Sequence, residues 1–291
     1  MQSGGVWACI VCWRAQVGVL RALVEAVAPQ VDQVIVVDNA ADPALAAALP
    51  PGVRYVAMPS NAGTAGAMNR AWEIALGEGA QALACFDQDS VPAAGMVQRL
   101  REGLAVAGPR AAAVGPLKVD PRNGKPGRLL MPVRFLRRFA RPAGTAPIEV
   151  DHLITSGCLI PASAYRAVGP YDEALFLDYV DMEWCVRARG AGLHHYCIPS
   201  ATLSHTIGDE VVDVGGRTLS LHGPLRSYLL VRNHLLLWRK TSMPRLWLLS
   251  DALQVAKKVC GLLLLAPQRA ARLREVVRGI GDGLRGRGGA P

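Results

Sequence analysis

The chain has 291 residues, of which 51% are hydrophobic and 19% are charged, and its formal net charge is +9. This composition suits one large globular domain or one domain with an appendage. No signal peptide is expected, because the first apolar stretch has no basic residues before it. Residues 217–291 carry 14 Lys and Arg against three acids, whereas residues 1–216 carry 18 against 20. The positive charge therefore belongs to the C-terminal segment.

The cysteines indicate a reduced, cytoplasmic protein. There are seven, an odd number, and most lie inside apolar runs, which favours core thiols over disulfides. Cys9 and Cys12 have the C-x-x-C spacing, but on a strand their side chains would point to opposite faces. We therefore assign them no metal or redox role.

Alternating strands and helices predict an α/β fold with a doubly wound, mostly parallel sheet. Strands are expected at 6–12, 34–37, 54–57, 82–87 and 112–115. The region from Pro116 to Pro147 is expected to be a surface excursion that closes over a site, after which 150–160 resumes the sheet. Helical spacing joins these apolar sets: Leu20, Leu23, Val24 and Val27; Ala71, Ile74 and Ala75; Met96, Val97, Leu100 and Leu104, with Ser90 as the expected N-cap of the last helix.

Two carboxylates one residue apart, Asp87 and Asp89, end the fourth expected strand. In an open α/β sheet, ligands bind just beyond the carboxyl ends of strands. Adjacent anions repel each other unless a cation neutralises them. The pair therefore predicts a divalent metal that carries a diphosphate.

Two earlier segments are candidate nucleotide contacts. Asp38 ends the second strand, where a carboxylate either accepts hydrogen bonds from a nucleoside or closes an Asx-turn. Residues 61–70 begin a helix with Gly63 and Gly66, which let backbone approach a ligand at the helix N-terminus. Their spacing matches neither a dinucleotide nor a P-loop fingerprint.

A second acidic cluster contains Asp178, Asp181 and Glu183. Apolar spacing puts Asp181 near a helix start, where it is either a cap or a reactive group. Glu183 is expected to pair with Arg187 on the helix surface. His205 follows a later strand and would complete the ligand set of a two-carboxylate metal site.

In chain order these motifs resemble glycosyltransferase family 2, and within it the bacterial rhamnosyltransferases. D-Q-D-S and D-Y-V-D-x-E-W are typical of the rhamnosyl subgroup, as is Val180 where the wider family often has an acid. The matching segments run to about residue 233: V-V-D-N (Asp38), N-x-G-x-x-x-x-x-N (Asn61, Gly63, Asn69), F-D-Q-D-S (Asp87, Asp89), T-S-G (Ser156, Gly157), F-L-D-Y-V-D-x-E-W-C-x-R-A-R (Asp181), H-x-x-G-D (His205) and R-x-Y-x-x-x-R-N (Tyr228, Arg232, Asn233).

The resemblance implies an A-type nucleotide-sugar fold, inversion at the anomeric carbon and a dTDP-L-rhamnose donor. It also implies a bacterial glycan or glycolipid acceptor at the cytoplasmic face of the plasma membrane. By matching position, Asp181 would be the general base, with Asp178 as second choice; Asp89 and His205 would bind Mg²⁺ or Mn²⁺; Asp38, Asn61, Gly63, Asn69, Asp87 and Gly157 would contact the donor; Asp178 and Arg232 would lie on the acceptor or phosphate side.

The C-terminal segment divides from a catalytic domain at 1–233. Residues 234–280 are expected to form an amphipathic extension, with apolar positions at Leu249, Leu253, Ala256, Cys260 and Leu263. Charges interrupt the apolar run, which argues against a transmembrane helix. Trp and flanking cations suit an anionic membrane surface, and packing on the domain or in a homodimer is the alternative. Nucleic acid is disfavoured, and 281–291 is expected to be disordered.

Two other functions stay open. Residues 87–91 satisfy the D-x-D-x-[TV] pattern of haloacid-dehalogenase phosphatases, with Asp87 as nucleophile, although that strand usually opens the domain. A non-catalytic glycan-binding scaffold on the membrane is the second. A calcium loop of the EF-hand type fails because Pro92 stands where glycine is needed.

Overall fold

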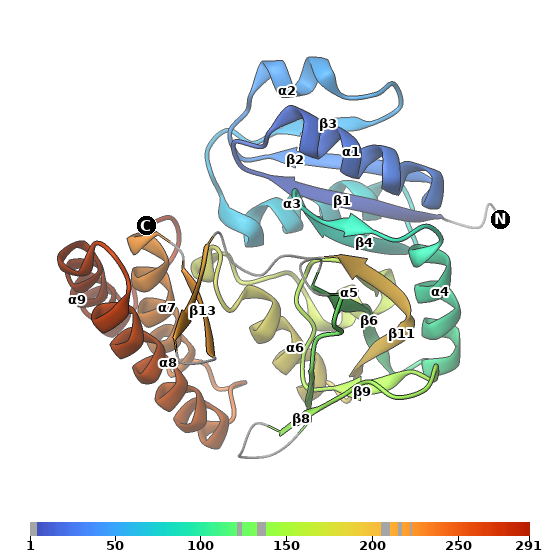
Figure 1. Ribbon diagram of the computed structural model, residues 1–291. Coiled ribbons are helices and arrows are strands. Elements are labelled where there is room, and N and C mark those ends of the chain that lie inside the picture. The colour runs from blue at the N-terminus through green and yellow to red at the C-terminus, as the bar shows by residue number, and fades with distance from the viewer. Residues whose placement is uncertain (1–4, 121–123, 133–137, 205–209, 215–216, 222) are drawn as a thin grey trace.

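The structure is a computed structural model, which describes residues 5–120, 124–132, 138–204, 210–214, 217–221 and 223–291. Within these residues, the main sheet has nine strands (Figure 1). Their order is β3 (Arg54–Ala57), β2 (Gln33–Asp38), β1 (Val6–Cys12), β4 (Ala82–Asp87), β10 (Cys158–Pro161), β6 (Ala111–Val119), β11 (His194–Ser204) and β5 (Val91–Pro92), with β9 (Ile148–Val150) beside β11.

The sheet confirms the expected α/β class. Strands β1 to β4 are parallel to one another, and β6 is parallel to β11. Strand β10 lies antiparallel between β4 and β6, because after the excursion that follows β6 the chain re-enters the sheet at the same end at which β6 left it. Two small hairpins complete the strands: β7 (Leu129–Met131) with β8 (Arg138–Ala140), and β12 (Glu210–Val214) with β13 (Arg217–Leu221).

Helices cover both faces of the sheet, and the alternation of side chains along β1 shows why. Cys9 belongs to one hydrophobic cluster, while Ile10 and Cys12 belong to the other. Helices α3, α5 and α6 cover the Cys9 face, and α1, α2 and α4 cover the Ile10 face. Their bounds are α1 (Val17–Val27), α2 (Pro43–Ala48), α3 (Gly63–Gly77), α4 (Met96–Ala107), α5 (Ala162–Val168) and α6 (Val180–Gly190), with 3-10 turns η1 (Ala28–Gln30) and η2 (Glu173–Leu175).

Two local predictions were wrong. Helix α4 begins at Met96 after Gly95, whose φ of +69° is left-handed, and not at Ser90. The Ser90 hydroxyl instead bonds the Ser156 hydroxyl. Pro116, expected to start the surface excursion, lies within β6.

Three helices form the C-terminal part: α7 (Pro224–Leu237), α8 (Arg245–Leu265) and α9 (Arg269–Arg285). They group at the side of the molecule away from α4 (Figure 1). No helix among the described residues is long and apolar enough to cross a membrane. Disorder was expected from residue 281, yet α9 continues to Arg285, and the Gly289 amide donates to the Ala174 carbonyl at 2.8 Å.

Glycines let α9 lie close against α7. A Cβ at Gly279 would sit 2.7 Å from the Tyr228 carbonyl oxygen, and one at Gly283 would sit 2.7 Å from the Leu235 Cβ. Backbone cannot yield as a flexible side chain does, so a larger residue must push the helices apart. Gly261 of α8, by contrast, has nothing within 4 Å of its Cβ position.

The two positions give a matched pair of substitutions. We expect Gly279→Ala to lower the free energy of unfolding by about 1–3 kcal/mol, because the added methyl meets backbone. Gly261→Ala should raise it by up to about 1 kcal/mol through helix propensity. Urea unfolding followed by circular dichroism measures both, and equal effects would contradict the close packing of α9 on α7.

Candidate active site

The carboxyl ends of the parallel strands bring the first candidate residues into one row. Cys12 is the register partner of Asp38, and Val11 is the partner of Asp87. Asp38 and Asp87 therefore end β2 and β4, the two strands that flank β1, at the same edge of the sheet. This is the edge at which ligands bind in open α/β sheets.

Asp87 and Asp89 are in different environments. Asp87 is partly buried, and burial raises the pKa of its carboxyl to about 6; Asp89 and Asp181 raise it as well, while Lys118 and Arg226 lower it. Asp89 is exposed at the tip of the strand. Between them, the Gln88 side chain accepts a hydrogen bond from the Trp13 amide at 2.8 Å. The aspartates thus form an anionic site with one open side.

The T-S-G segment joins this site to the second acidic cluster. The Asp87 amide donates to the Ser156 hydroxyl at 3.4 Å, and the Thr155 amide donates to Asp181 Oδ2 at 3.2 Å. Gly157 has a φ of +83°, and a Cβ there would lie 2.7 Å from Pro116. Glycine is required by both conformation and space, which keeps this segment against β4 and β6.

Asp181 lies in the first turn of α6, as expected. Its Oδ1 accepts from the Met182 amide at 2.8 Å, so backbone amides hold both oxygens. Thr155, which binds Asp181, adjoins Ser156, which binds the Asp87 amide, so one short segment links the two acidic clusters. Asp178 instead pairs with Arg226 at 2.7 Å, on the side facing α7.

Lys118 is the residue of this site that the motif analysis missed. It lies near the carboxyl end of β6, and its Nζ is buried with no hydrogen-bond partner among the residues described. Burial lowers its pKa, while the charges of Asp87 and Asp181 raise it. Its position gives the carboxylates a nearby cation. Only the strand pairing reveals it, because no local sequence signal marks it.

Asp38 is fully buried, and hydrogen bonds inside the protein satisfy it. It accepts from the Ala40 amide at 2.9 Å, the Asp42 amide at 2.8 Å and the Tyr55 hydroxyl at 2.9 Å. Asp38 therefore closes an Asx-turn, one of the two roles that the sequence allowed for it. Contact of Asp38 with a nucleoside stays a prediction.

Asn61 and Gly63 shape the N-terminus of α3. The Gly63 amide donates to Asn61 Oδ1 at 2.9 Å, and the Ala65 amide donates to the Phe176 carbonyl at 3.2 Å. A Cβ at Gly63 would lie 2.2 Å from that carbonyl oxygen. The segment just before Asp178 therefore rests directly on the helix start.

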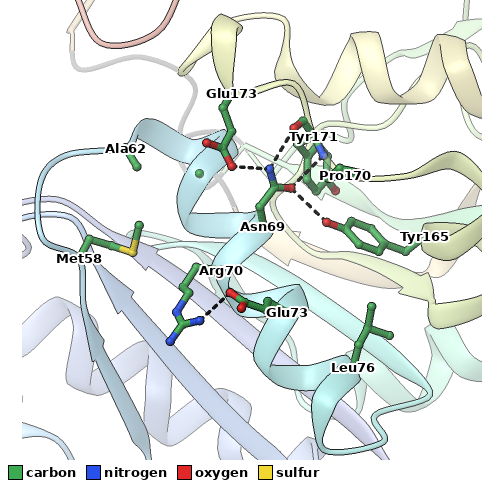
Figure 2. A pocket seen from close by; sticks show the side chains of 11 residues that line it. Met58, Ala62, Asn69, Arg70, Glu73, Leu76, Tyr165, Pro170, Tyr171 and Glu173 are labelled. Atoms are coloured by element: carbon green, nitrogen blue, oxygen red, sulfur yellow. Dashed lines mark hydrogen bonds and ion pairs between the residues drawn. The ribbon is translucent and has the colours of Figure 1, made fainter.

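Asn69 uses its whole amide within the protein (Figure 2). It donates to the Tyr171 carbonyl at 2.9 Å and to Glu173 at 2.8 Å, and accepts from the Tyr165 hydroxyl at 3.1 Å and the Tyr171 amide at 2.8 Å. These four bonds fill its two donor and two acceptor positions. A donor contact by Asn69 stays a prediction, but its observed work is to tie α3 to the loop before α6.

The cavity next to Asn69 does not contain the acidic residues. It measures about 690 Å³ and is lined by α3 and the loop at 170–173 (Figure 2). None of Asp87, Asp89 and Asp181 lines it. We place the site at the carboxylates because the charged groups converge there, and not at this cavity.

Arg232 and Asn233 hold the loop that precedes Asp181. Arg232 is fully buried and donates to the carbonyls of Gly289 at 2.8 Å, Ala174 at 3.4 Å and Leu175 at 3.4 Å. Asn233 donates to the carbonyls of Leu175 and Asp178, both at 2.7 Å. These bonds give Arg232 and Asn233 a structural role, and a contact of Arg232 with acceptor or phosphate stays a prediction.

Further contacts bind the same loop to the C-terminal helices. The Tyr179 hydroxyl donates to Asp251 of α8 at 2.6 Å, and Asp251 lies 2.9 Å from His234 Nδ1 of α7. Glu183 was expected on the surface but is fully buried, with Arg187 at 3.0 Å and Lys240 at 2.9 Å. Lys240, which follows the end of α7, and Arg187 of α6 thus supply the cations that pair with this buried carboxylate.

The aspartate pair fits a divalent cation. Among the residues described, no three His, Cys, Asp or Glu side chains meet to hold a metal alone. A small hard cation needs only one or two carboxylates when phosphate oxygens and water supply its other ligands. Asp89 is exposed and can bind such a cation. A cation would also stabilise the charged form of Asp87, which burial disfavours. His205, the third expected ligand, lies outside the described residues.

Comparison with known proteins identifies the family. The model of "Glycosyl transferase family 2" matches residues 8–169, which include Asp38, Asp87 and the T-S-G segment. The chain belongs to glycosyl transferase family 2. It is also 29% identical, over 98% of its length and 97% of the relative's, to a dTDP-rhamnosyl transferase, RfbF, from Shigella flexneri.

Solved structures of low identity share the fold of this family 2 enzyme. GalNAc-T7, solved with UDP, GalNAc and Mn²⁺, has a TM-score of 0.55 at 13% identity, covering 72% of this chain and 44% of that one. TarS from S. aureus has a TM-score of 0.57 at 11% identity, covering 97% of this chain and 49% of that one. The present chain thus spans about half the length of either.

The raised pKa of Asp87 predicts a pH-dependent cost to folding. Above about pH 6 the folded protein must hold a disfavoured charge, so the uncharged isostere Asp87→Asn should raise the free energy of unfolding, by up to about 3 kcal/mol. The gain should fade as pH falls from about 6 and vanish well below 3.8, where wild-type Asp87 is protonated in both the folded and the unfolded state. Urea titrations in EDTA at several pH values measure this. A gain that grows at low pH would contradict the assigned environment.

The placement of Arg232 predicts that its loss is structural. Arg232→Met should lower the free energy of unfolding by on the order of 3 kcal/mol, since buried carbonyls lose a charged donor. Arg226→Met, which removes a partly exposed ion pair, should cost less than about 1 kcal/mol. Unchanged stability of Arg232→Met, with a raised KM for donor or acceptor, would instead indicate a ligand contact.

Proposed function

We propose that this family 2 enzyme is an inverting, metal-dependent transferase that moves L-rhamnose from dTDP-L-rhamnose to a hydroxyl of a bacterial glycan or glycolipid. The near full-length similarity to a dTDP-rhamnosyl transferase supports the donor. A cytoplasmic location on the inner face of the plasma membrane accords with such a donor and acceptor. A homodimer stays a prediction.

The observation that carries the proposal is the arrangement of Asp181 relative to Asp87 and Asp89. Backbone amides of Thr155 and Met182 hold the Asp181 carboxylate, and Ser156, next to Thr155, accepts from the Asp87 amide. One side of the site therefore offers a fixed proton acceptor, and the other offers an anionic pair that suits a cation and diphosphate. Single displacement at a sugar carbon needs both.

The chemistry follows from these groups. The acceptor oxygen forms a bond to the anomeric carbon as the bond from that carbon to the diphosphate oxygen breaks, and the leaving electron pair departs with dTDP. Asp181 takes the proton of the acceptor hydroxyl. A bound Mg²⁺ or Mn²⁺ would stabilise the negative charge of the leaving diphosphate as a Lewis acid, held by Asp89 with Asp87 nearby.

The donor nucleoside is proposed to lie between β1 and β2. Trp13 follows β1, is 42% exposed and is tied to the Asp87–Asp89 segment through Gln88. An exposed indole ring there offers a stacking surface for the thymine base. The Gly63 carbonyl accepts from the side-chain amide of Asn39, next to Asp38, at 3.2 Å, and the Gly157 amide donates to the Cys85 carbonyl, two residues before Asp87, at 2.6 Å.

The phosphatase alternative is contradicted by the family match, which covers Asp87 within a glycosyltransferase domain. A scaffold without activity would leave the carboxylate arrangement unused. Release of inorganic phosphate from simple monoesters, or no turnover at all, would revive these alternatives.

The test measures turnover and donor binding separately. With a panel of nucleotide sugars, we expect dTDP-L-rhamnose to bind most tightly by calorimetry, and EDTA to abolish release of dTDP. Asp89→Ala should abolish both turnover and metal dependence.

The general base has its own control. Asp181→Asn should bind donor like wild type and lose about 10²–10⁴ in turnover, whereas Asp178→Asn should retain most of it. Wild-type turnover by Asp181→Asn would overturn the assignment and move the base to Asp178.

A further inference from the structure

Helix α8 is apolar on the side that faces away from the protein. Leu248, Val255 and Leu262 are buried, while on the opposite side Leu246, Leu249, Leu253 and Leu264 are 50%, 50%, 61% and 68% exposed. These exposed residues recur at helical spacing and include positions that the sequence predicted for the apolar face. The predicted apolar face is therefore not the packing face.

Helix α9 repeats the pattern. Its inner side, which includes Val276, Gly279 and Gly283, packs on α7. A second row is exposed: Leu273, Val277, Ile280 and Leu284. Together, α8 and α9 carry more than half of the large exposed apolar side chains among the described residues, an amount that marks an interaction surface.

Cations accompany both rows. Lys257 lies within the α8 row and Arg245 at its start, while Arg274, Arg278 and Arg285 accompany the α9 row, all exposed. Residues 217–291 hold 14 Lys and Arg against three acids. A second copy would bring like charges together, whereas an anionic lipid surface attracts them.

We propose that the exposed faces of α8 and α9 dock this protein on an anionic lipid bilayer, lying in the interface. Amphipathic helices with leucine on one side and Lys or Arg around it bind this way, by burying apolar area and by attraction to anionic headgroups. The proposal needs no catalytic activity, so it stands or falls separately from the proposed function.

The inner face of α8 contacts the loop that precedes Asp181, so docking of α8 would place this loop close to the bilayer. Asp251 bonds the Tyr179 hydroxyl at 2.6 Å, two residues before Asp181. Arg226, Lys258 and Arg272 surround Asp178 where α7, α8 and α9 meet this loop. A docked α8 thus lies between the bilayer and the loop that carries the proposed base.

Vesicle co-sedimentation tests the apolar part. The full chain should sediment with vesicles of phosphatidylcholine and phosphatidylglycerol, and weakly with phosphatidylcholine alone. Leu249→Glu/Leu253→Glu and Leu273→Glu/Val277→Glu should each weaken binding by at least about tenfold. Val106→Glu on α4, where Val106 is 74% exposed, is the matched control and should bind like wild type. Thermal unfolding by circular dichroism should be alike for all variants.

Charge-reversal substitutions test the contribution of the cations. Lys257→Glu and Arg274→Glu should each weaken binding severalfold and reduce its salt dependence, whereas Arg101→Glu on α4 should not. Failure of the wild type to bind anionic vesicles, or equal loss in the α4 controls, overturns the proposal. So does light scattering that shows a dimer in wild type and a monomer in Leu249→Glu/Leu253→Glu, since the face would then hold a second copy.

Discussion

Repulsion among Asp87, Asp89 and Asp181 is the constraint on which the site depends. The carboxyl end of β4, the T-S-G segment and the start of α6 bring these carboxylates together, and burial already disfavours the charge of Asp87. The repulsion among the three carboxylates lowers the free energy of unfolding. Lys118 supplies part of the compensating charge from β6, and a site that remains anionic is prepared for a cation and the diphosphate that comes with it.

The position of Asp181 is determined by contacts from three directions. Asn69 of α3 holds the loop at 171–173, Arg232 and Asn233 of α7 hold 174–178, and Asp251 of α8 holds Tyr179. The loop needs them, since Phe176 and Tyr179 have left-handed φ values of +64° and +71° that non-glycine residues seldom adopt. Residues far along the chain thus set the geometry of one carboxylate.

The C-terminal helices use one face to pack against the loop before Asp181 and against each other. The opposite faces of α8 and α9 are apolar and exposed. The inner faces of α7, α8 and α9 carry buried polar groups and close glycine contacts. A helix that only completed a core would present polar residues to water. The outer side of α8 instead presents exposed leucines to water.

Local pattern alone determined much of this protein. Period and apolar runs predicted β1 to β4, α1 and α3, because buried strands and amphipathic helices leave regular spacing in the chain. The acidic pairs at strand and helix ends located Asp87, Asp89 and Asp181, since sheet topology puts such ends at one edge. Only the tertiary structure showed that Glu183 is buried beside Lys240, that Ser90 bonds Ser156 instead of capping α4, that Arg232 holds a loop, and that Lys118 lies beside the carboxylates. Each of these depends on a partner more than 25 residues away, or on which face of a helix the rest of the chain covers, and neither leaves a signal in neighbouring residues.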